Sequence, residues 1–147
     1  DAACFPEFDR FSRRSIYRFL RRPAGSVWLD LILADEVAVG YALYLARKNS
    51  ARLRYYTLCI LPEYSGMGIA QEYLSRRLNR FPDRFCELVM AVRKSNGASI
   101  HLHEKFGFQP VRGSSFLYPD GEDGILMAKV LSTFRQKEQE LRVRGNP

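Results

Sequence analysis

The sequence contains few of the residues from which metal sites and disulfide frameworks are built. It has three cysteines and two histidines among 147 residues. Cys4, Cys59 and Cys86 are far apart and lie among apolar neighbours. An odd number of dispersed cysteines argues against a disulfide framework and against a zinc site. We therefore expect no metal and a reducing, cytoplasmic compartment.

Long apolar runs are also missing. No stretch approaches the roughly 18 residues that a membrane-spanning helix needs, and the first residues lack the apolar segment of a signal peptide. The sequence therefore predicts a soluble protein without a membrane partner.

Apolar residues are nevertheless abundant. They make up 46% of the chain and include ten phenylalanines and eight tyrosines. A chain of this length can bury one sizeable core, which predicts a single domain over residues 1–131. Residues 132–147 are mostly polar and carry the Thr133/Gln136 spacing of a capping box, which predicts a charged, helical C-terminal tail.

Positive charge is in excess. The formal net charge is +7 and the pI is near 9.6, and many of the arginines lie in residues 10–22, between apolar positions. This charge is compatible with a nucleic-acid partner, an acidic substrate or a polyanionic cofactor. The spacing favours an amphipathic surface helix with a solvated basic face over a nucleic-acid surface. The oligomeric state is not indicated.

Hydrophobic periodicity and turn residues predict an α/β domain. Three strands follow the basic helix, and two further helices alternate with the remaining strands. The expected strands cover residues 26–33, 37–46, 53–61, 85–92, 106–111 and 125–131, and the later helices cover residues 67–79 and 96–106. Because hairpins are mixed with crossover helices, we expect a mixed, mostly antiparallel central sheet with helices on both faces.

The segment "ILPEYSGMGIAQEYL", residues 60–74, joins a strand end to a helix start through a loop with two glycines. Glycines let the main chain approach a ligand closely, and a helix N-terminus offers unpaired N–H groups to an anion. No Lys-Ser/Thr pair follows the glycines and no third glycine is present, so the common mononucleotide and dinucleotide motifs do not fit. The loop still predicts a phosphate ligand.

Together with "SNGASIHLHEKFGF", residues 95–108, this loop resembles the GNAT superfamily of acyl-CoA-dependent N-acyltransferases. Gly68 and Ala70 match the pyrophosphate loop of that family, whereas Ser65 stands where Gln or Arg is usual. The C-terminal segments resemble the bacterial ribosomal-protein-alanine N-acetyltransferase branch. The resemblance covers roughly residues 27–131, and it implies that the first strand of the family fold is missing here.

The resemblance implies acetyl-CoA as cosubstrate and no metal. The main chain of one strand would pair with the pantetheine amides, the glycine loop would hold the pyrophosphate, and an asparagine would bind the pantetheine arm. In this sequence the residues implied are Leu58, Cys59, Ile60, Gly66, Met67, Gly68, Ile69, Ala70, Gln71 and Asn96.

The branch also implies where protons move. Its catalytic acid lies seven residues after the asparagine, where this chain has His103, and the usual base positions are occupied by Ala91 and Arg54. Neither Ala91 nor Arg54 can accept a proton. His103 titrates near 6.5 when unperturbed and is our candidate acid for the departing thiolate. Water, Glu87 or Glu104 remain candidate bases.

The predicted function is N-acetyl transfer from acetyl-CoA to an amine. A missing base matters least for a protein or peptide N-terminal amine, whose pKa of about 7.7 to 8.0 lies far below the value of about 10.4 for lysine. A small-molecule amine, such as a polyamine, aminoglycoside or amino acid, is the alternative acceptor. A catalytically silent acyl-CoA-binding module is the alternative outside the enzymes.

Overall fold

The computed structural model describes residues 4–5 and 10–131. The tail predicted for residues 132–147 lies outside the described residues. The elements follow in the order α1 (Arg13–Leu20), β1 (Val27–Ala34), β2 (Val37–Ala46), β3 (Arg52–Ile60), η2 (Pro62–Tyr64), α2 (Ile69–Arg77), β4 (Glu87–Arg93), α3 (Gly97–Lys105), β5 (Gln109–Leu117) and β6 (Asp123–Val130). Every strand and helix predicted within the described residues is present.

The strands form one six-stranded sheet in the order β1-β2-β3-β4-β6-β5. All neighbouring pairs are antiparallel except β3 and β4, which run parallel and are connected through α2. This arrangement confirms the mixed, mostly antiparallel sheet.

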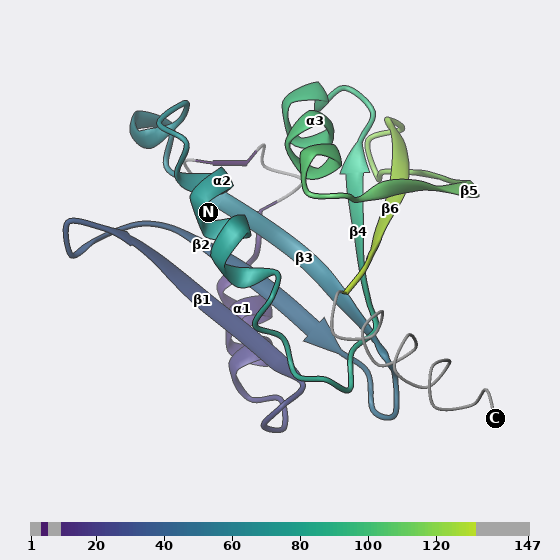
Figure 1. Cartoon of the computed structure of the whole chain (residues 1–147), viewed down its shortest axis with the longest axis horizontal. Helices are drawn as coiled ribbons and strands as arrows, with labels where there is room; N and C mark the ends of the chain where they lie inside the picture. Colours follow the sequence, from purple (N-terminus) through teal and green to yellow (C-terminus); the bar gives the residue numbers. More distant parts are fainter. Residues whose placement is uncertain (1–3, 6–9, 132–147) are drawn as a thin grey trace, which may run out of the picture.

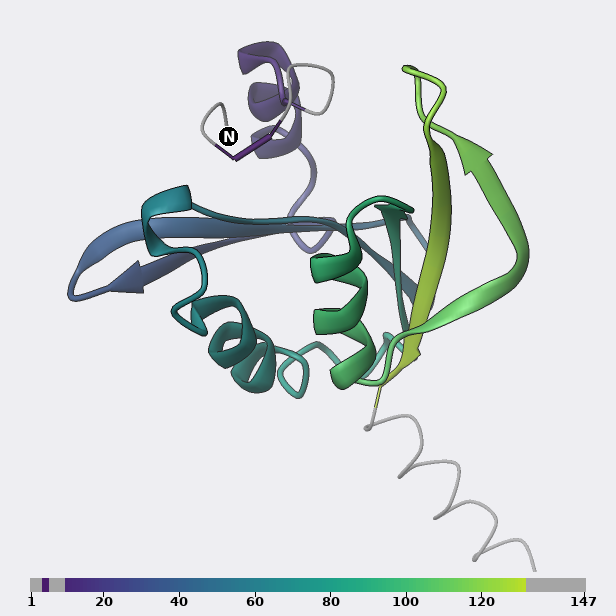
Figure 2. The ribbon, with the colours of Figure 1, turned by 90° about the horizontal axis from the view of Figure 1, so that it is seen from above.

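Helices cover both faces of the sheet (Figure 2). The basic helix α1 lies on one face of β1, β2 and β3, whereas α2 and α3 lie on the opposite face. Helices α2 and α3 therefore cover the core face of the sheet, and α1 covers part of the opposite face.

Local signals set the helix ends. The Ser12 side chain accepts a hydrogen bond from the Ser15 N–H and begins α1, as expected of an N-cap serine. Helix α2 begins later than predicted, at Ile69 rather than at residue 67, because Gly68 adopts a left-handed φ of 79° that a helix cannot contain. Gly107, with φ of 81°, ends α3 as predicted.

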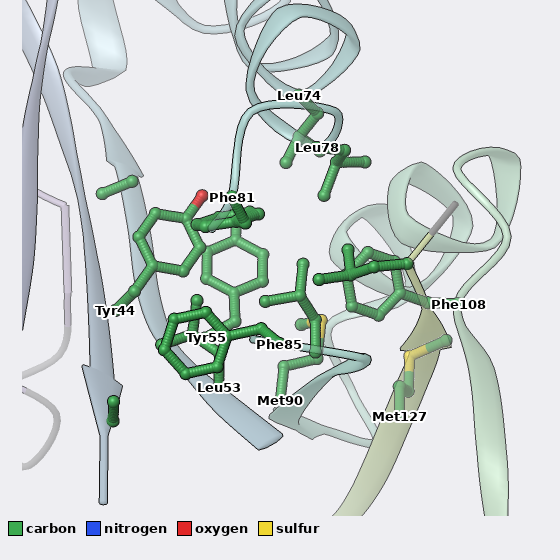
Figure 3. Packing of buried hydrophobic residues seen from close by; sticks show 14 of the residues in the cluster. Tyr44, Leu53, Tyr55, Leu74, Leu78, Phe81, Phe85, Met90, Phe108 and Met127 are labelled. Atoms are coloured by element: carbon green, nitrogen blue, oxygen red, sulfur yellow. The ribbon is translucent and has the colours of Figure 1, made fainter. Parts of the chain in front are cut away.

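The core lies between the sheet and the helices α2 and α3 (Figure 3). Tyr44, Phe85 and Phe108 are the largest of its fully buried side chains. Leu74 and Leu78 of the α2 segment point down toward the aromatic side chains of the core. Because aromatic side chains bury the most area per residue, they supply much of the hydrophobic stabilisation here.

A chain of hydrogen bonds enters this core from the surface. The Tyr73 hydroxyl donates to Asp30 Oδ2 at 2.7 Å and lies 2.9 Å from the Tyr44 hydroxyl. Arg77 Nε donates to the same Asp30 oxygen at 2.6 Å. Burial raises the pKa of Tyr73 and of Tyr44 above the usual value. Both phenols therefore stay protonated and available as donors.

We expect Tyr73→Phe to lower the free energy of unfolding by about 1 to 3 kcal/mol, because it leaves the fully buried Tyr44 hydroxyl without its partner. Urea unfolding of the variant and the wild type measures the difference. Tyr17→Phe, at a ring that is 64% exposed, is the control and should change little. A decrease in the free energy of unfolding no greater than that of the control would show that this chain of hydrogen bonds contributes nothing to stability.

The prediction that the cysteines form no disulfide was wrong. Cys4 and Cys59 are bonded, with their Cα atoms 6.1 Å apart, across 55 positions in the sequence. Cys86 is free. The bond joins the segment before α1 to β3, which the fold brings together and the spacing alone does not indicate. A reducing compartment consequently no longer follows from the cysteines.

Candidate functional site

The candidate site is an opening in the sheet between β3 and β4. These strands pair only from Arg52 to Arg54, opposite Glu87 to Val89. Figure 1 shows them side by side at their starts and well apart at their ends. Among the described residues, no strand therefore pairs with one edge of β3 from Tyr55 to Ile60. Six residues of strand make an open edge of about 20 Å.

The backbone groups on this edge come from alternate residues. The Leu61 N–H donates to the Val39 carbonyl on the β2 side. Cys59, two residues before Leu61, pairs with Tyr41 of β2. Because antiparallel pairing alternates, the N–H and C=O groups of Cys59 face β2, and those of Leu58 and Ile60 face the opening. Of the three predicted cofactor residues on β3, two thus direct their backbone groups toward the opening.

The disulfide brings the N-terminal segment to the same edge. Cys4 Sγ lies 3.4 Å from the Ile60 carbonyl oxygen. The Cys59 side chain is 4% exposed and points to the α1 face. A segment remote in sequence therefore borders the opening on the side away from α2 and α3.

The glycine loop lies between the end of β3 and the start of α2. Gly66 and Gly68 have φ of 78° and 79°, which favour glycine over other residues. No atom lies within 4 Å of a Cβ built on either glycine. The first intrahelical hydrogen bond of α2 runs from the Glu72 N–H to the Gly68 carbonyl. The N–H groups of residues 69–71 therefore have no partner within the helix. Open space, unpaired donors and the positive end of the helix dipole suit a phosphate group.

Asn96 caps α3. Its Oδ1 accepts a hydrogen bond from the Ser99 N–H at 3.0 Å. The cap uses only the oxygen, so the side-chain amide nitrogen retains two donors. The two roles considered for Asn96, helix cap and cofactor ligand, are thus compatible.

His103 lies on the inner face of α3 and is 3% exposed. Its Nδ1 lies 2.7 Å from the Ser99 carbonyl oxygen, and its ring packs against Tyr55 and Phe108 at centroid distances of 5.4 and 5.3 Å. A carbonyl only accepts, so Nδ1 carries the proton and Nε2 presents a lone pair.

This environment changes the role expected of His103. Burial lowers the pKa of the imidazole below 6.5, against a smaller opposite effect of the Ser99 carbonyl. At neutral pH the ring is therefore neutral, with an unprotonated Nε2. A protonated imidazole can donate a proton to a thiolate, whereas a neutral imidazole with a bare Nε2 can accept one.

The candidate bases do not gather at the opening. Glu87 is paired with Arg52 at 2.6 Å, at the closed end of the β3–β4 pair, and Glu104 is exposed. Arg54 is exposed with its guanidinium 5.9 Å from the Tyr56 ring centroid. Ala91 follows the part of β4 that pairs with β3, and its side chain has no polar group.

Sequence patterns missed a charged cluster that fixes the loop between β5 and β6. Glu122 accepts hydrogen bonds from Ser95 Oγ at 2.5 Å and from Arg93 at 2.7 Å. Arg93 also pairs with Asp120 at 2.8 Å. The Ser95 and Arg93 bonds lower the pKa of the Glu122 carboxyl. The loop is thereby tied to the turn that leads into α3, and no spacing motif marks these partners.

Three cations, two on α2 and one just before α3, have carboxylate partners. Arg76 pairs with Glu72 at 2.6 Å, Arg77 with Asp30 at 2.6 Å and Lys94 with Asp123 at 2.9 Å. An anionic ligand that binds one of these side chains would therefore compete with its carboxylate partner.

The described residues contain neither a membrane-spanning helix nor a cluster of metal ligands. Between residues 10 and 131 and at residues 4–5, no helix is long and apolar enough to cross a membrane. Within the same ranges, no group of His, Cys, Asp and Glu side chains is placed to hold a metal ion.

Curated relatives of this chain are named N-alpha-acetyltransferases. The chain is 35% identical over 77 residues to an N-alpha-acetyltransferase of Saccharolobus solfataricus, a match that covers 51% of this chain and 46% of the relative. It thus spans about half the length of that relative. Residues 1–108 match the family model described as the acetyltransferase (GNAT) family.

Solved structures show the same fold. The ribosomal-protein-S18-alanine N-acetyltransferase of Escherichia coli superimposes with a TM-score of 0.69 at 20% identity, over 83% of this chain and 78% of that one. A GNAT family acetyltransferase of Elizabethkingia anophelis, crystallised with acetyl-CoA bound, gives a TM-score of 0.63 at 16% identity, over 82% and 84%. The chain therefore belongs to the acetyltransferase (GNAT) family, whose members take the acetyl group from acetyl-CoA.

Proposed function

We propose that this chain transfers an acetyl group from acetyl-CoA to the α-amine of a protein or peptide N-terminus. The observation that carries the proposal is the opening between β3 and β4, with the glycine loop at the end of β3 and α3 beside β4. Family membership supplies the cosubstrate. The name of the archaeal relative, an N-alpha-acetyltransferase, supports the choice of acceptor.

The binding roles follow the path from loop to opening. The loop and the first turn of α2 bind the pyrophosphate through backbone N–H groups. Leu58 and Ile60 pair with the pantetheine amides as a neighbouring strand does, Cys59 supports them from the β2 side, and the Asn96 amide nitrogen donates to the pantetheine arm. The loop residues assigned are Gly66, Met67, Gly68, Ile69, Ala70 and Gln71.

The catalytic role falls to His103, whose Nε2 takes up a proton during transfer. An N-terminal amine, with a pKa of about 7.7 to 8.0, is partly neutral at physiological pH and needs little help to attack, whereas a lysine amine near 10.4 is almost fully protonated. The base positions of the similar branch hold Ala91 and Arg54 here. The missing carboxylate therefore favours an N-terminal α-amine.

We expect peptides with a free α-amine to be acetylated at least about tenfold faster than matched peptides whose only amine is a lysine side chain, because the amine pKa values differ by more than two units. Release of the free CoA thiol, followed with a thiol reagent at pH 7.5, measures both rates. The same peptides with a blocked N-terminus are the control for background hydrolysis.

Other outcomes would replace the proposal. Preferred acetylation of a polyamine, an aminoglycoside or an amino acid over every peptide would make a small-molecule acetyltransferase the better assignment. Tight acetyl-CoA binding without thiol release on any amine would instead indicate a silent binding module.

A further inference from the structure

Two buried polar atoms within residues 10–131 have no hydrogen-bond partner, and they lie on neighbouring side chains. They are the Tyr55 hydroxyl oxygen and His103 Nε2. Tyr55 is 2% exposed and His103 is 3% exposed. Protein interiors rarely leave such groups unsatisfied, and the exceptions often mark a site that binds something else.

Both groups lie at the narrow end of the opening. Arg54 is the last β3 residue that pairs with β4, so Tyr55 is the first residue beyond the junction. The strand also bulges here, because Tyr44 pairs with Tyr55 while Leu43 pairs with Thr57. The His103 ring approaches that of Tyr55 from α3 at 5.4 Å between centroids. Such bulges re-aim side chains next to active sites.

The two groups complement each other. Nδ1–H of His103 donates to the Ser99 carbonyl, so Nε2 is an acceptor. Burial, together with the neighbouring Tyr44 hydroxyl, raises the pKa of Tyr55 well above 10, so its hydroxyl stays protonated at rest and can donate a hydrogen bond. One buried donor and one buried acceptor, neither with a hydrogen-bond partner, thus lie on side chains whose rings are 5.4 Å apart.

The hydroxyls behind Tyr55 are already ordered. Tyr73 gives its proton to Asp30, so in the Tyr44–Tyr73 bond Tyr44 must be the donor. The rings of Tyr44 and Tyr55 stack with their centroids 4.8 Å apart. Because the Tyr44 proton is used in the bond to Tyr73, Tyr44 cannot donate that proton to a Tyr55 phenolate, which favours a protonated Tyr55 at rest.

We propose that Tyr55 is the proton donor of the acetyl transfer and works as a pair with His103. The inference rests on the proposed function. As the amine attacks, a C–N bond forms and the C–S bond breaks. The nitrogen loses one proton to His103 Nε2, and the sulfur receives one from the Tyr55 hydroxyl. Transfer of the proton from Nε2 to the Tyr55 oxygen restores both residues, so no further reactant is needed.

Tyr55→Phe tests the proposal because it removes one oxygen atom and keeps the ring. We expect kcat to fall about 10²-fold, with the Kd for acetyl-CoA within about twofold of the wild type. Since the lost hydroxyl has no partner, the Tm should stay the same or rise. Tyr56→Phe, at the adjacent ring that is 46% exposed, is the matched control and should leave kcat unchanged.

The double variant Tyr55→Phe/His103→Phe separates a working pair from two independent residues. We expect it to be about as slow as the slower single variant, because residues that act as a unit are not additive. An unchanged kcat in Tyr55→Phe, or a drop in kcat that matches a drop in Tm, would overturn the proposal.

An NMR measurement keeps the test independent of turnover. In protein with 15N-labelled histidine, adding CoA should shift the His103 Nε2 signal in the wild type and shift it differently in Tyr55→Phe, because a thiol placed between the two groups contacts both. A signal that does not respond to bound CoA would overturn the pairing even if the enzyme is active. Conversely, a chain that acetylates no amine but shows the shift would refute the proposed acceptor and leave the pair supported.

Discussion

Replacing Gly68 with valine is expected to lower the affinity for acetyl-CoA by at least about 100-fold. The glycine holds φ at 79° at the start of α2, where a phosphate would lie against the backbone. A β-branched side chain fills the space that the phosphate needs and disfavours this φ by about 1 to 2 kcal/mol. No protein atom lies within 4 Å of the added Cβ, so the fold should survive.

Gly113→Val is the matched control for this variant. Gly113 has φ of 72° and equally open surroundings, but it lies in β5. Both variants should therefore lose similar stability in urea unfolding, and only Gly68→Val should lose binding in calorimetry. Wild-type affinity in folded Gly68→Val would remove the glycine loop from the cofactor site.

The second large effect is expected for His103→Phe, which should lower kcat by about 10²- to 10⁴-fold with little change in the Kd for acetyl-CoA. Phenylalanine fills the buried space beside Tyr55 and Phe108 and removes the proton acceptor. His101→Phe, at an exposed position of the same helix, is the control and should keep wild-type kcat. Initial rates of thiol release with a saturating peptide measure both variants.

The pH dependence of the wild type tests which proton role His103 has. A proton acceptor must be unprotonated, so kcat should fall as the pH drops through the lowered pKa, below 6.5. The sequence-based role as an acid predicts the opposite, a fall with rising pH. A plateau that persists at acid pH, or equal rates in His103→Phe, would show that water or another residue moves the proton.

Stability should follow the same titration. The unfolded chain binds a proton at His103 near pH 6.5, and the folded chain binds it only at lower pH because burial lowers the pKa. Stability is therefore fully present above about 6.5 and declines as the pH falls through the window below it. His103→Phe should remove this part of the pH dependence.

Much of the fold follows from local patterns. Alternating and continuous apolar runs indicated each strand, and Asn96 stands at the predicted start of the helix that it caps. The glycine loop was equally readable, because positive φ values and a helix start depend on residues within a few positions of one another. The same motifs carried the family resemblance.

The chemistry of the site could not be derived in this way. His103 was identified by its distance from Asn96, but its burial depends on the rings of Tyr55 and Phe108, and its tautomer depends on the Ser99 carbonyl. Tyr55 carries no motif at all. Its importance appears only where β3 leaves β4 and its hydroxyl is left without a partner.

The sequence by itself determined the elements, their order and the glycine loop, since each is encoded by neighbouring residues, and the family resemblance that these residues carry gave the class of cosubstrate. Only the tertiary structure decided the Cys4–Cys59 bond across 55 positions, the divergence of β3 from β4, and the burial that lowers the pKa of His103. These features arise from contacts between segments far apart in the chain, and desolvation depends on what packs around a group rather than on what adjoins it in sequence.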